Sequence, residues 1–513
     1  MITQTYGGAL YGVDAQLISI EVNIVQGTNL YVVGLPDSSI KESQHRIESV
    51  LKTIHCEMPR QRIIVNLAPA DIKKEGSLYD LPIALCILHS SYQYYFNNLD
   101  QCLILGELAL DGTLRPIKGV LSMAIMAKNN GLKYFILPEQ NANEASIVEG
   151  LNVIPVKNIH EAIDFLIGKK IIDPVFNNIE TFINKENDIY DIDLSDVQGQ
   201  NSAKRALEIA ASGGHNLIMI GSPGSGKTML AQRISTILPK MTVEECLETT
   251  KIYSISSNIN GVITKRPFRS PHHTISDVAL VGGGSIPQPG EISLAHNGVL
   301  FLDELPEFSR SVLEVMRQPL EDRKVNISRT KMTVNYPCNF MLIASMNPCP
   351  CGYFNDPNKE CNCTNYQIQR YISKISGPLL DRIDIHINIL PVNYDSISCR
   401  RPSVKSSEVQ QRVEKARNRQ LERFKKMNIT NIYTNSMMTP NMIKEICVIS
   451  EDGNLMLKNA MEKLNLSARA YSKILKLSRT IADLEDSDDI KEDHIAEAIQ
   501  YRSLDRKNCG DRY

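Results

Sequence analysis

The sequence predicts a multidomain α/β protein, with an α+β amino-terminal domain, a parallel-sheet core and a helical carboxy-terminal domain. Its 513 residues leave room for several separate hydrophobic cores. Apolar residues make up 42% of the chain and charged residues 22%, a composition typical of folded rather than disordered proteins. The pattern of strands and helices also changes twice along the chain, which indicates more than one domain.

These changes of pattern give the expected domain boundaries. Residues 1–170 mix short β-rich runs with helical patterns and predict the α+β domain. Residues 171–193 are polar and rich in Asn, Asp and Glu, which favours a linker. Residues 194–395 alternate strands and helices, and residues 396–513 are mostly helical. Four continuous apolar runs in the core predict strands buried on both faces of a parallel sheet. These runs are Asn216–Ile220, Gly298–Leu302, Phe340–Ser345 and Ile385–Leu390.

The charge balance excludes a strongly basic protein. Lys and Arg number 56 against 58 Asp and Glu, a net charge of -2, so binding to nucleic acid would need local clusters of positive charge. One such cluster lies between Arg400 and Lys426, where interspersed Glu residues equally favour a solvated helix face. No apolar run is long enough to predict a membrane span, and the amino terminus lacks the pattern of a secretory signal. We therefore expect a cytoplasmic protein with no membrane partner.

The strongest motif follows the first predicted core strand. Residues 221–228 read Gly-Ser-Pro-Gly-Ser-Gly-Lys-Thr, a phosphate-binding loop between a predicted strand and a predicted helix. Its glycines let backbone N–H groups surround phosphates, while Lys227 reaches the β- and γ-phosphates and Thr228 holds Mg²⁺. The loop thus predicts binding of Mg²⁺ and ATP. The residues expected to bind the nucleotide are Gly221, Ser222, Pro223, Gly224, Ser225, Gly226, Lys227 and Thr228.

Polar side chains follow two other predicted core strands. Asp303 and Glu304 come directly after an apolar run, and Asn347 follows the next one. Beside a phosphate loop, the first carboxylate is expected to hold Mg²⁺ and the second to activate the attacking water. Asn347 is expected at the same edge of the sheet, where it would orient that water against the γ-phosphate.

The phosphate loop, the acidic pair and Asn347 together resemble the AAA+ family. The segment from Ser376 to Asp384 resembles the family's arginine-finger segment, which implies that Arg382 projects into the ATP of a neighbouring subunit. Ser467-Ala-Arg469 resembles the second sensor of the family, so Arg469 would touch the phosphates from a helical lid. For both arginines, a structural position on the protein surface is the alternative interpretation.

Residues 268–291 carry a more specific resemblance. They include His272, His273 and three consecutive glycines, and they resemble the magnesium-chelatase-like ATPases, in particular the ComM/YifB branch. The resemblance covers nearly the whole chain. It implies a hexameric homo-oligomer that uses ATP to remodel DNA, as a helicase or branch-migration motor in recombination or natural transformation. The alternatives are a magnesium-chelatase ATPase subunit, a protein-remodelling AAA+ ATPase, an ATP-dependent protease and a nucleotide-gated scaffold.

A β-hairpin is predicted over residues 324–336, where alternating apolar residues flank a polar turn. In related replicative helicases such hairpins line a central pore. The resemblance therefore implies that Arg329 and Lys331 contact DNA phosphates, together with His272 and His273. A solvated turn and a pair of hydrogen-bonded histidines are the alternative.

Four of the twelve cysteines are clustered and form two C-x-C pairs separated by nine residues. Four thiolates are suited to a structural, tetrahedral Zn²⁺ in a reducing compartment. Because C-x-C is tighter than the usual spacing, a free-thiol loop is the alternative. Bound zinc would fix the loop that follows Asn347. The predicted ligands are Cys349, Cys351, Cys361 and Cys363.

The amino-terminal domain resembles the Lon-protease-like domain, with a ribosomal S5 domain 2-like fold, that opens ComM-type chains. Active Lon proteases use a Ser–Lys dyad. Here Ser77 lies too early for the nucleophile, Leu121 occupies the position of the base, and Lys118 lies three residues away. Because a serine without a base is a weak nucleophile, we expect no proteolysis.

Overall fold

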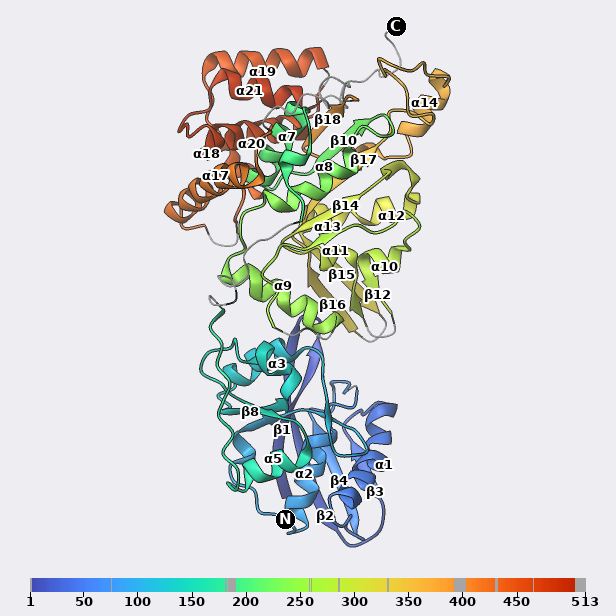
Figure 1. The fold of residues 1–513 in the computed structure, drawn as a ribbon, viewed down its shortest axis with the longest axis vertical. Coiled ribbons are helices and arrows are strands. Elements are labelled where there is room, and N and C mark those ends of the chain that lie inside the picture. Colours follow the sequence, from blue (N-terminus) through green and yellow to red (C-terminus); the bar gives the residue numbers. More distant parts are fainter. Residues whose placement is uncertain are drawn as a thin grey trace. The chain divides into compact units, whose positions relative to one another are not determined.

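The computed structural model describes residues 2–74, 76–179, 182, 191–257, 259, 261–284, 287–329, 332–391, 403–429, 432–464 and 466–502. The chain forms two compact units (Figure 1). Unit 1 comprises Met1–Asn187, Thr242–Thr264 and Asn326–Tyr336. Unit 2 comprises Asp188–Met241, Lys265–Val325 and Pro337–Tyr513. The predicted linker at residues 171–193 coincides with the first passage between the units, but two segments inside the predicted core belong to unit 1.

Unit 1 is built on a seven-stranded mixed sheet with the strand order β3-β4-β2-β1-β5-β8-β9. Strands β1, β2 and β4 pair antiparallel, and the other neighbours are parallel. The sequence did not predict β1, which contains Gly7 and Gly8 and therefore matches a strand pattern poorly. The strands are β1 (Ile2–Tyr11), β2 (Asp14–Val25), β3 (Leu30–Val33), β4 (Arg62–Ala68), β5 (Cys102–Ile104), β8 (Tyr134–Pro138) and β9 (Asn152–Val156), with a small hairpin of β6 (Glu107–Leu108) and β7 (Leu114–Arg115).

Helices cover both faces of this sheet. Side chains of a strand alternate between its faces, and Ile104 packs in one hydrophobic cluster while its neighbour Leu103 packs in the other. Helices α1, α2 and α5 contribute to the cluster of Ile104, and α3 and α4 to that of Leu103. The helices are α1 (Ser38–Thr53), α2 (Asp80–Ser90), α3 (Val120–Asn129), α4 (Ala142–Ala145) and α5 (Ile159–Leu166).

Helix α9 (Val243–Ser256) belongs to unit 1, although the sequence placed it in the core. The Ser254 hydroxyl donates to the buried carboxylate of Glu144, which also accepts from the Leu121 backbone N–H at 2.8 Å. Lys118 Nζ donates to the Ser256 carbonyl at 3.0 Å. Helix α9 is therefore held against the amino-terminal end of α3.

The predicted hairpin is present as β15 (Lys324–Arg329) and β16 (Met332–Pro337), which form a two-stranded sheet. Residues 326–336 belong to unit 1, where the Tyr11 hydroxyl donates to the Thr333 carbonyl at 2.9 Å. The Gly12 backbone lies so close to the Val334 side chain that a Cβ atom would stand 2.6 Å from it. The hairpin therefore packs on the turn between β1 and β2.

Unit 2 contains the predicted parallel sheet, with the order β11-β14-β17-β10-β18 and every pair parallel. Its strands are β10 (Leu217–Gly221), β11 (Phe268–Arg269), β14 (Val299–Leu302), β17 (Met341–Met346) and β18 (Ile385–Ile389). The four predicted runs are confirmed as strands of one sheet. The sequence missed β11, which is too short to give a periodic signal.

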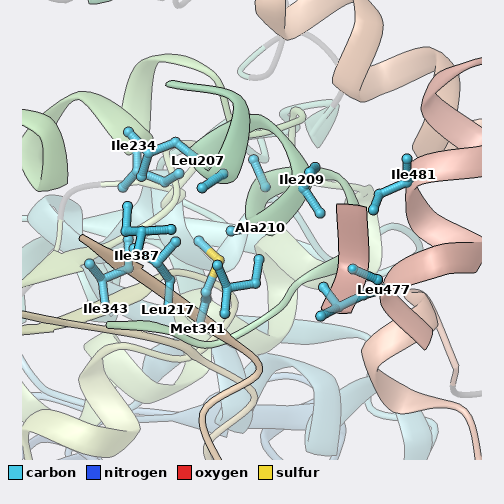
Figure 2. Packing of buried hydrophobic residues seen from close by; sticks show 14 of the residues in the cluster. Leu207, Ile209, Ala210, Leu217, Ile234, Met341, Ile343, Ile387, Leu477 and Ile481 are labelled. Atoms are coloured by element: carbon cyan, nitrogen blue, oxygen red, sulfur yellow. The ribbon is translucent and has the colours of Figure 1, made fainter. Parts of the chain in front are cut away.

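The carboxy-terminal helices share one hydrophobic core with this sheet. Leu217, Ile343 and Ile387 of the sheet and Ala210 of α7 (Asn201–Gly213) lie in the same cluster as Ile481 of α20, as Figure 2 shows. The sequence predicted that residues 396–513 are mostly helical, and the structure divides the described part of this region into separate helices. The helices are α17 (Ser406–Lys426), α18 (Pro440–Ile446), α19 (Glu451–Leu464), α20 (Ala468–Leu484) and α21 (Glu492–Gln500).

Short helices occupy the connections of unit 2. Helix α8 follows β10, α10 and α11 lie between β11 and β14, α12 and α13 precede β15, and α14 and α15 precede β18. Their bounds are α8 (Lys227–Arg233), α10 (Asp277–Val281), α11 (Glu291–Leu294), α12 (Arg310–Val315), α13 (Arg317–Asp322), α14 (Asn365–Ile372) and α15 (Gly377–Leu380).

A buried ion pair connects the sheet to α20. Lys473 Nζ lies 2.9 Å from Asp384 Oδ1 at the start of β18, and the Asn216 backbone N–H donates to Asp384 Oδ2 at 3.0 Å. Burial alone would raise the pKa of Asp384, but Lys473 and His215 hold it well below its usual value. Asp384 therefore fixes α20 relative to the segment that carries residues 381 and 382.

None of the helices in the described ranges combines the length and the apolar character that crossing a membrane would require.

The buried carboxyl of Glu144 predicts a pH-dependent stability of unit 1. Glu144 is 1% exposed, and desolvation raises its pKa from 4.5 to about 7 despite its hydrogen bonds. A raised carboxyl pKa means that the folded state binds the proton more tightly, so stability falls as the pH rises from below 4.5 to above 7. Glu144→Gln removes this loss of folding stability, which reaches about 3 kcal/mol when Glu144 is fully ionised.

We therefore expect Glu144→Gln to stabilise the protein relative to wild type at pH 8 more than at pH 5, as measured by thermal unfolding. Glu139→Gln serves as the control, because Glu139 is exposed and forms only a 3.5 Å surface pair with Lys157. An equal difference at both pH values would show that Glu144 is not held neutral.

Candidate active site

The phosphate loop connects β10 to α8 in a conformation that depends on glycine. Gly224 and Gly226 have φ values of 78° and 88°, in the left-handed region that residues with a Cβ atom avoid. Lys227 Nζ donates to the carbonyls of Gly221 at 2.8 Å and Ser222 at 3.0 Å, so the side chain folds back over the loop. Burial lowers the pKa of Lys227, whereas the carboxylates of Asp303 and Glu304 raise it.

The two predicted Mg²⁺ ligands contact each other. Thr228 Oγ1 donates to Asp303 Oδ2 at 2.9 Å. The other oxygen, Oδ1, accepts from the Ser345 hydroxyl and from the Glu304 backbone N–H at 3.1 Å. A hydroxyl and a carboxylate at this spacing suit the oxygen preference of Mg²⁺, with the remaining positions left for water and phosphate.

Glu304 has φ 54° and ψ 50°, a left-handed backbone that is unusual for a residue other than glycine. Its backbone N–H donates to Asp303 Oδ1 and, at 3.3 Å, to Ser345 Oγ, which stabilises this conformation. Strained backbone of this kind concentrates at functional sites. The Glu304 side chain is exposed and directly follows Asp303, one of the two predicted Mg²⁺ ligands.

Asn347 is brought to the phosphate loop as predicted. It follows β17, which lies between β10 and β14, and its Oδ1 accepts from Lys227 Nζ at 3.2 Å. The structure therefore gathers Lys227, Thr228, Asp303 and Asn347 at the carboxyl edge of three adjacent strands.

Arg382 and Arg469 lie together, away from these contacts. Arg382 Nη2 pairs with Glu321 Oε1 at 2.6 Å and Nη1 donates to the Pro378 carbonyl at 2.6 Å. Arg469 lies in the first turn of α20. Its Nη2 atom lies 4.0 Å from Glu321 Oε1, and its Nη1 atom lies 4.0 Å from Asp381 Oδ2. The Arg382 side chain is 11% exposed and that of Arg469 is 60% exposed. The two arginines thus share one acidic partner.

Sequence reasoning missed three groups that support the site. Ser345 is the polar residue at the end of the buried strand β17, a pattern that could have identified it. Gln200 Nε2 donates to the Ser225 carbonyl of the phosphate loop at 2.7 Å, a contact with no signal in the local sequence. Glu321 is one of many acidic residues on helices, and only the folded chain places it beside Arg382.

The four clustered cysteines converge. Their sulfur atoms all lie within 4.8 Å of one another, and Cys349 Sγ lies 3.3 Å from Cys351 Sγ and 3.7 Å from Cys361 Sγ. Zn–S bonds of about 2.3 Å place the sulfurs of a tetrahedral site about 3.8 Å apart, so the four thiols fit Zn²⁺. Burial raises the pKa of Cys351, but hydrogen bonds from the Tyr353 backbone and neighbouring thiols bring it below its usual value, which favours a thiolate ligand.

The residues predicted to contact DNA are only partly described. His272 and His273 follow β11, their rings lie 4.1 Å apart, and His273 packs edge-on against Phe308 at 6.4 Å. Lys331 and the side chain of Arg329 lie outside the described residues. Within the Gly-rich segment, β12 (Gly282–Gly283) and β13 (Gln288–Pro289) pair antiparallel.

The basic helix α17 uses much of its charge inside unit 2. Arg412 pairs with Glu208 at 2.5 Å, and Lys415 pairs with Asp486 at 2.7 Å. Arg419 also pairs with Asp486, and Arg423 with the buried Asp483. These contacts favour the structural interpretation of this charged segment over a DNA-binding face.

The amino-terminal unit shows no Ser–Lys dyad at the residues considered in the sequence. Ser77 donates to the Glu107 carboxylate, and Lys118 donates to the Ser256 carbonyl. Leu121 is buried in α3. Ser77 and Lys118 are thus each engaged with other groups, and the absence of proteolysis stays a prediction.

Family models match three segments of the chain. A family model described as "Magnesium chelatase, subunit ChlI" matches residues 193–397, one described as "Subunit ChlI of Mg-chelatase" matches residues 20–141, and one described as "Magnesium chelatase, subunit ChlI C-terminal" matches residues 403–502. The fold and the site define an ATPase of the magnesium-chelatase class.

Similarity to individual proteins identifies the family within this class of ATPases. The chain is 42% identical to the uncharacterized protein YifB of Escherichia coli K12 over 509 residues, covering 97% of this chain and 96% of YifB. It is 43% identical to competence protein ComM of Haemophilus influenzae over 510 residues, covering 98% and 97%. Similarity to the magnesium-chelatase 67 kDa subunit of Chlorobaculum parvum is 27% over 208 residues, or 39% of this chain and 27% of that protein. The chain belongs to the ComM/YifB family of AAA+ ATPases.

The contact between Ser345 and Asp303 yields a prediction. Ser345→Ala removes a hydrogen bond to a carboxylate, worth about 1.5–3 kcal/mol, and leaves Asp303 freer to turn away from Thr228. We expect the Mg²⁺ concentration for half-maximal ATP hydrolysis to rise about tenfold. Ser373→Ala, at an exposed serine that follows α14, is the control. An unchanged Mg²⁺ requirement would show that Ser345 does not position Asp303.

Proposed function

We propose that this protein hydrolyses Mg²⁺-bound ATP at the junction between subunits of a hexameric ring and uses the energy to remodel DNA. The observation that carries the proposal is the convergence of Lys227 with Asn347 and of Thr228 with Asp303 at one edge of a parallel sheet. Such an arrangement holds the phosphates and the metal on one side and leaves room for water on the other.

In this proposal each residue has a distinct part. Lys227 and the backbone N–H groups of the loop bind the β- and γ-phosphates, and Thr228 and Asp303 hold Mg²⁺, which neutralises phosphate charge when it is bound. Glu304 accepts a proton from the attacking water, and Asn347 orients that water. Within one chain, Asn347 also holds the Lys227 ammonium, which couples the water-orienting group to the phosphate-binding group.

Arg382 completes the site from the neighbouring subunit. Its guanidinium pairs with Glu321 on α13 of its own chain. The exposed Arg469 also lies beside Glu321, so both cations share this carboxylate. A phosphate of the adjacent subunit's ATP would compete with Glu321 for them, because a triphosphate carries more negative charge than one carboxylate. We propose that Arg382 and Arg469 contact the same neighbouring nucleotide.

The DNA substrate is proposed from the family. One relative is named a competence protein, and the resemblance to ring helicases implies a pore lined by hairpins. The positive charges of Arg329 and Lys331 suit phosphate contacts, and the histidines at 272 and 273 supply further donors. A motor that consumes ATP on DNA, with reduced cysteine thiols, would work in the cytoplasm.

Lys227→Ala tests nucleotide binding. Removal of the ammonium leaves the phosphate charge unbalanced, so we expect both ATP binding and hydrolysis to fall to background. Isothermal titration and phosphate-release assays measure the two effects. ATP hydrolysis at the wild-type rate by this variant would place the active site elsewhere.

Glu304→Gln tests the assignment of the base. The amide cannot accept the proton, so we expect ATP binding to persist while turnover falls by about 10²–10⁴-fold. Glu307→Gln is the matched control, since Glu307 lies three residues further on and pairs with Lys374 at 3.2 Å. Normal turnover in Glu304→Gln would refute the assignment.

Mixed subunits test whether Arg382 acts across a junction. Arg382→Ala alone should lose about 10³-fold in turnover, and Lys227→Ala alone should be inactive. In a mixture of the two variants, a Lys227→Ala subunit supplies Arg382 to the intact phosphate loop of its neighbour, so activity should return in part. The doubly substituted chain mixed with Arg382→Ala is the control and should restore nothing. If the first mixture recovers no ATP hydrolysis, Arg382 does not act on the ATP of a neighbouring subunit.

The second candidate function is that of a magnesium-chelatase ATPase subunit. The match of all three family models to ChlI favours it. The two functions differ in what stimulates hydrolysis. We expect single-stranded, duplex or branched DNA to accelerate ATP hydrolysis by the wild-type protein, with Lys227→Ala as the background control. Hydrolysis that is indifferent to all three forms of DNA would favour the chelatase function.

We also propose that Cys349, Cys351, Cys361 and Cys363 hold a structural Zn²⁺. The spacing of their sulfur atoms supports this assignment. Four thiolate ligands leave no coordination position open for a substrate, so the ion would stabilise the fold of the loop and take no part in the chemistry.

A further inference from the structure

The loop that carries the four cysteines lies against the phosphate loop. It begins directly after Asn347 and leads from β17 to α14. The Phe354 backbone N–H donates to Cys349 Sγ at 3.3 Å, so the first cysteine also organises the chain that follows it. The position of the loop is thus set at its start by the strand that carries Asn347.

The closest approach occurs at Gly352. This residue has φ 85°, and a Cβ atom at this position would lie 2.5 Å from Pro223 Cδ and 2.7 Å from Pro223 Cγ. Pro223 is the third residue of the phosphate loop, so only a residue without a side chain lets the two loops pack this closely. Asn347 Cγ lies 3.9 Å from the same point. Gly352 therefore touches both the phosphate-binding loop and the residue that holds Lys227.

A polar contact joins the same two loops. The Asp356 carboxylate accepts from the Asn358 backbone N–H at 2.8 Å, and the Ser222 hydroxyl lies near enough to help lower the pKa of Asp356. Ser222 is buried at the start of the phosphate loop. Phe354, Asn355 and Asp356 also line a cavity of about 190 Å³ together with Gly221 and Ser222. The cysteine loop and the start of the phosphate loop therefore line the same cavity.

We propose that metal binding by the four cysteines controls the nucleotide affinity of the phosphate loop, through the contacts of Gly352 with Pro223 and of Asp356 with Ser222. The proposal rests on the proposed function, since it concerns the affinity of the same site for ATP. Cys351 is the neighbour of Gly352, so a metal–sulfur bond at Cys351 fixes the backbone that packs on Pro223. Without the metal, the backbone hydrogen bond from Gly352 N–H to the Cys349 carbonyl at 3.0 Å and weak thiol hydrogen bonds hold this segment, so we expect it to support the phosphate loop less firmly.

The first test changes the contact and keeps the ligands. In Gly352→Ala, the new methyl group meets Pro223, and the left-handed backbone is unfavourable for a residue with a Cβ atom. We expect this variant to retain one zinc per chain while its affinity for a fluorescent ATP analogue with Mg²⁺ weakens about tenfold, which is about 1.4 kcal/mol. Gly131→Ala is the matched control, because Gly131 has φ 73° and no atom within 4 Å of the position of a Cβ.

A second variant addresses the polar contact. Asp356→Ala removes the acceptor for Ser222 without touching a cysteine, and we expect the affinity for the same analogue to weaken about fivefold. Full zinc content with wild-type affinity in both Gly352→Ala and Asp356→Ala would overturn the proposal.

Removal of the metal completes the test. Zinc is measured in the purified full-length chain, extracted with a chelator, and restored, and Cys361→Ser provides a chain with one ligand fewer. We expect the nucleotide affinity to fall on extraction and to return on addition of Zn²⁺. A chain without zinc as purified, or a nucleotide affinity that is unchanged by extraction, would overturn the proposal. Loss of DNA-stimulated hydrolysis with unchanged nucleotide affinity would overturn it as well and would indicate that the loop contacts DNA.

The result also separates this inference from the proposed function. If the zinc-loaded wild-type chain binds no nucleotide, both the proposed function and this inference are wrong. If nucleotide binding requires Lys227 but its affinity does not change when the metal is removed, only this inference is wrong.

Discussion

The carboxylate of Asp303 accepts hydrogen bonds from Thr228, from Ser345 and from the backbone of Glu304. These donors come from the helix after β10, from β17 and from the turn after β14, so one side chain connects three adjacent strands. Parallel strands bring their carboxyl ends to one edge, and this arrangement makes the connection possible. The left-handed backbone of Glu304 and the position of the Mg²⁺ ligands both depend on this carboxylate.

The carboxy-terminal helices determine where the two arginines lie. Asp384 binds Lys473 of α20 and the Asn216 backbone, so it holds the start of α20 near the segment of Arg382. Arg469, four residues before Lys473, is thereby placed at Glu321 beside Arg382. Both arginines therefore contact the same carboxylate, and the expected contact of Arg469 with phosphates stays a prediction.

The sequence predicted the core of unit 2 well because its signals are local. Four apolar runs marked the central strands, and the phosphate loop, Asp303 and Asn347 follow strand ends whose position could be predicted. It failed where the structure depends on distant contacts. Strand β1 has a weak pattern, since two glycines interrupt it, and it pairs with β5 some ninety residues away. Glu321 and Gly352 carry no motif, and their partners, Arg382 and Pro223, are known only from the folded chain.

The placement of α9 and of the hairpin β15–β16 affects how the protein can be divided. The chain passes between its two units at residues 187–188, 241–242, 264–265, 325–326 and 336–337. Cleavage at the polar segment around residue 187 would sever one of these passages and leave four. A shortened chain that begins at residue 188 would expose the apolar side of α9 and the strand β16, which normally pack on residues 1–187. A division of the chain that keeps unit 1 whole must therefore retain residues 242–264 and 326–336 together with residues 1–187.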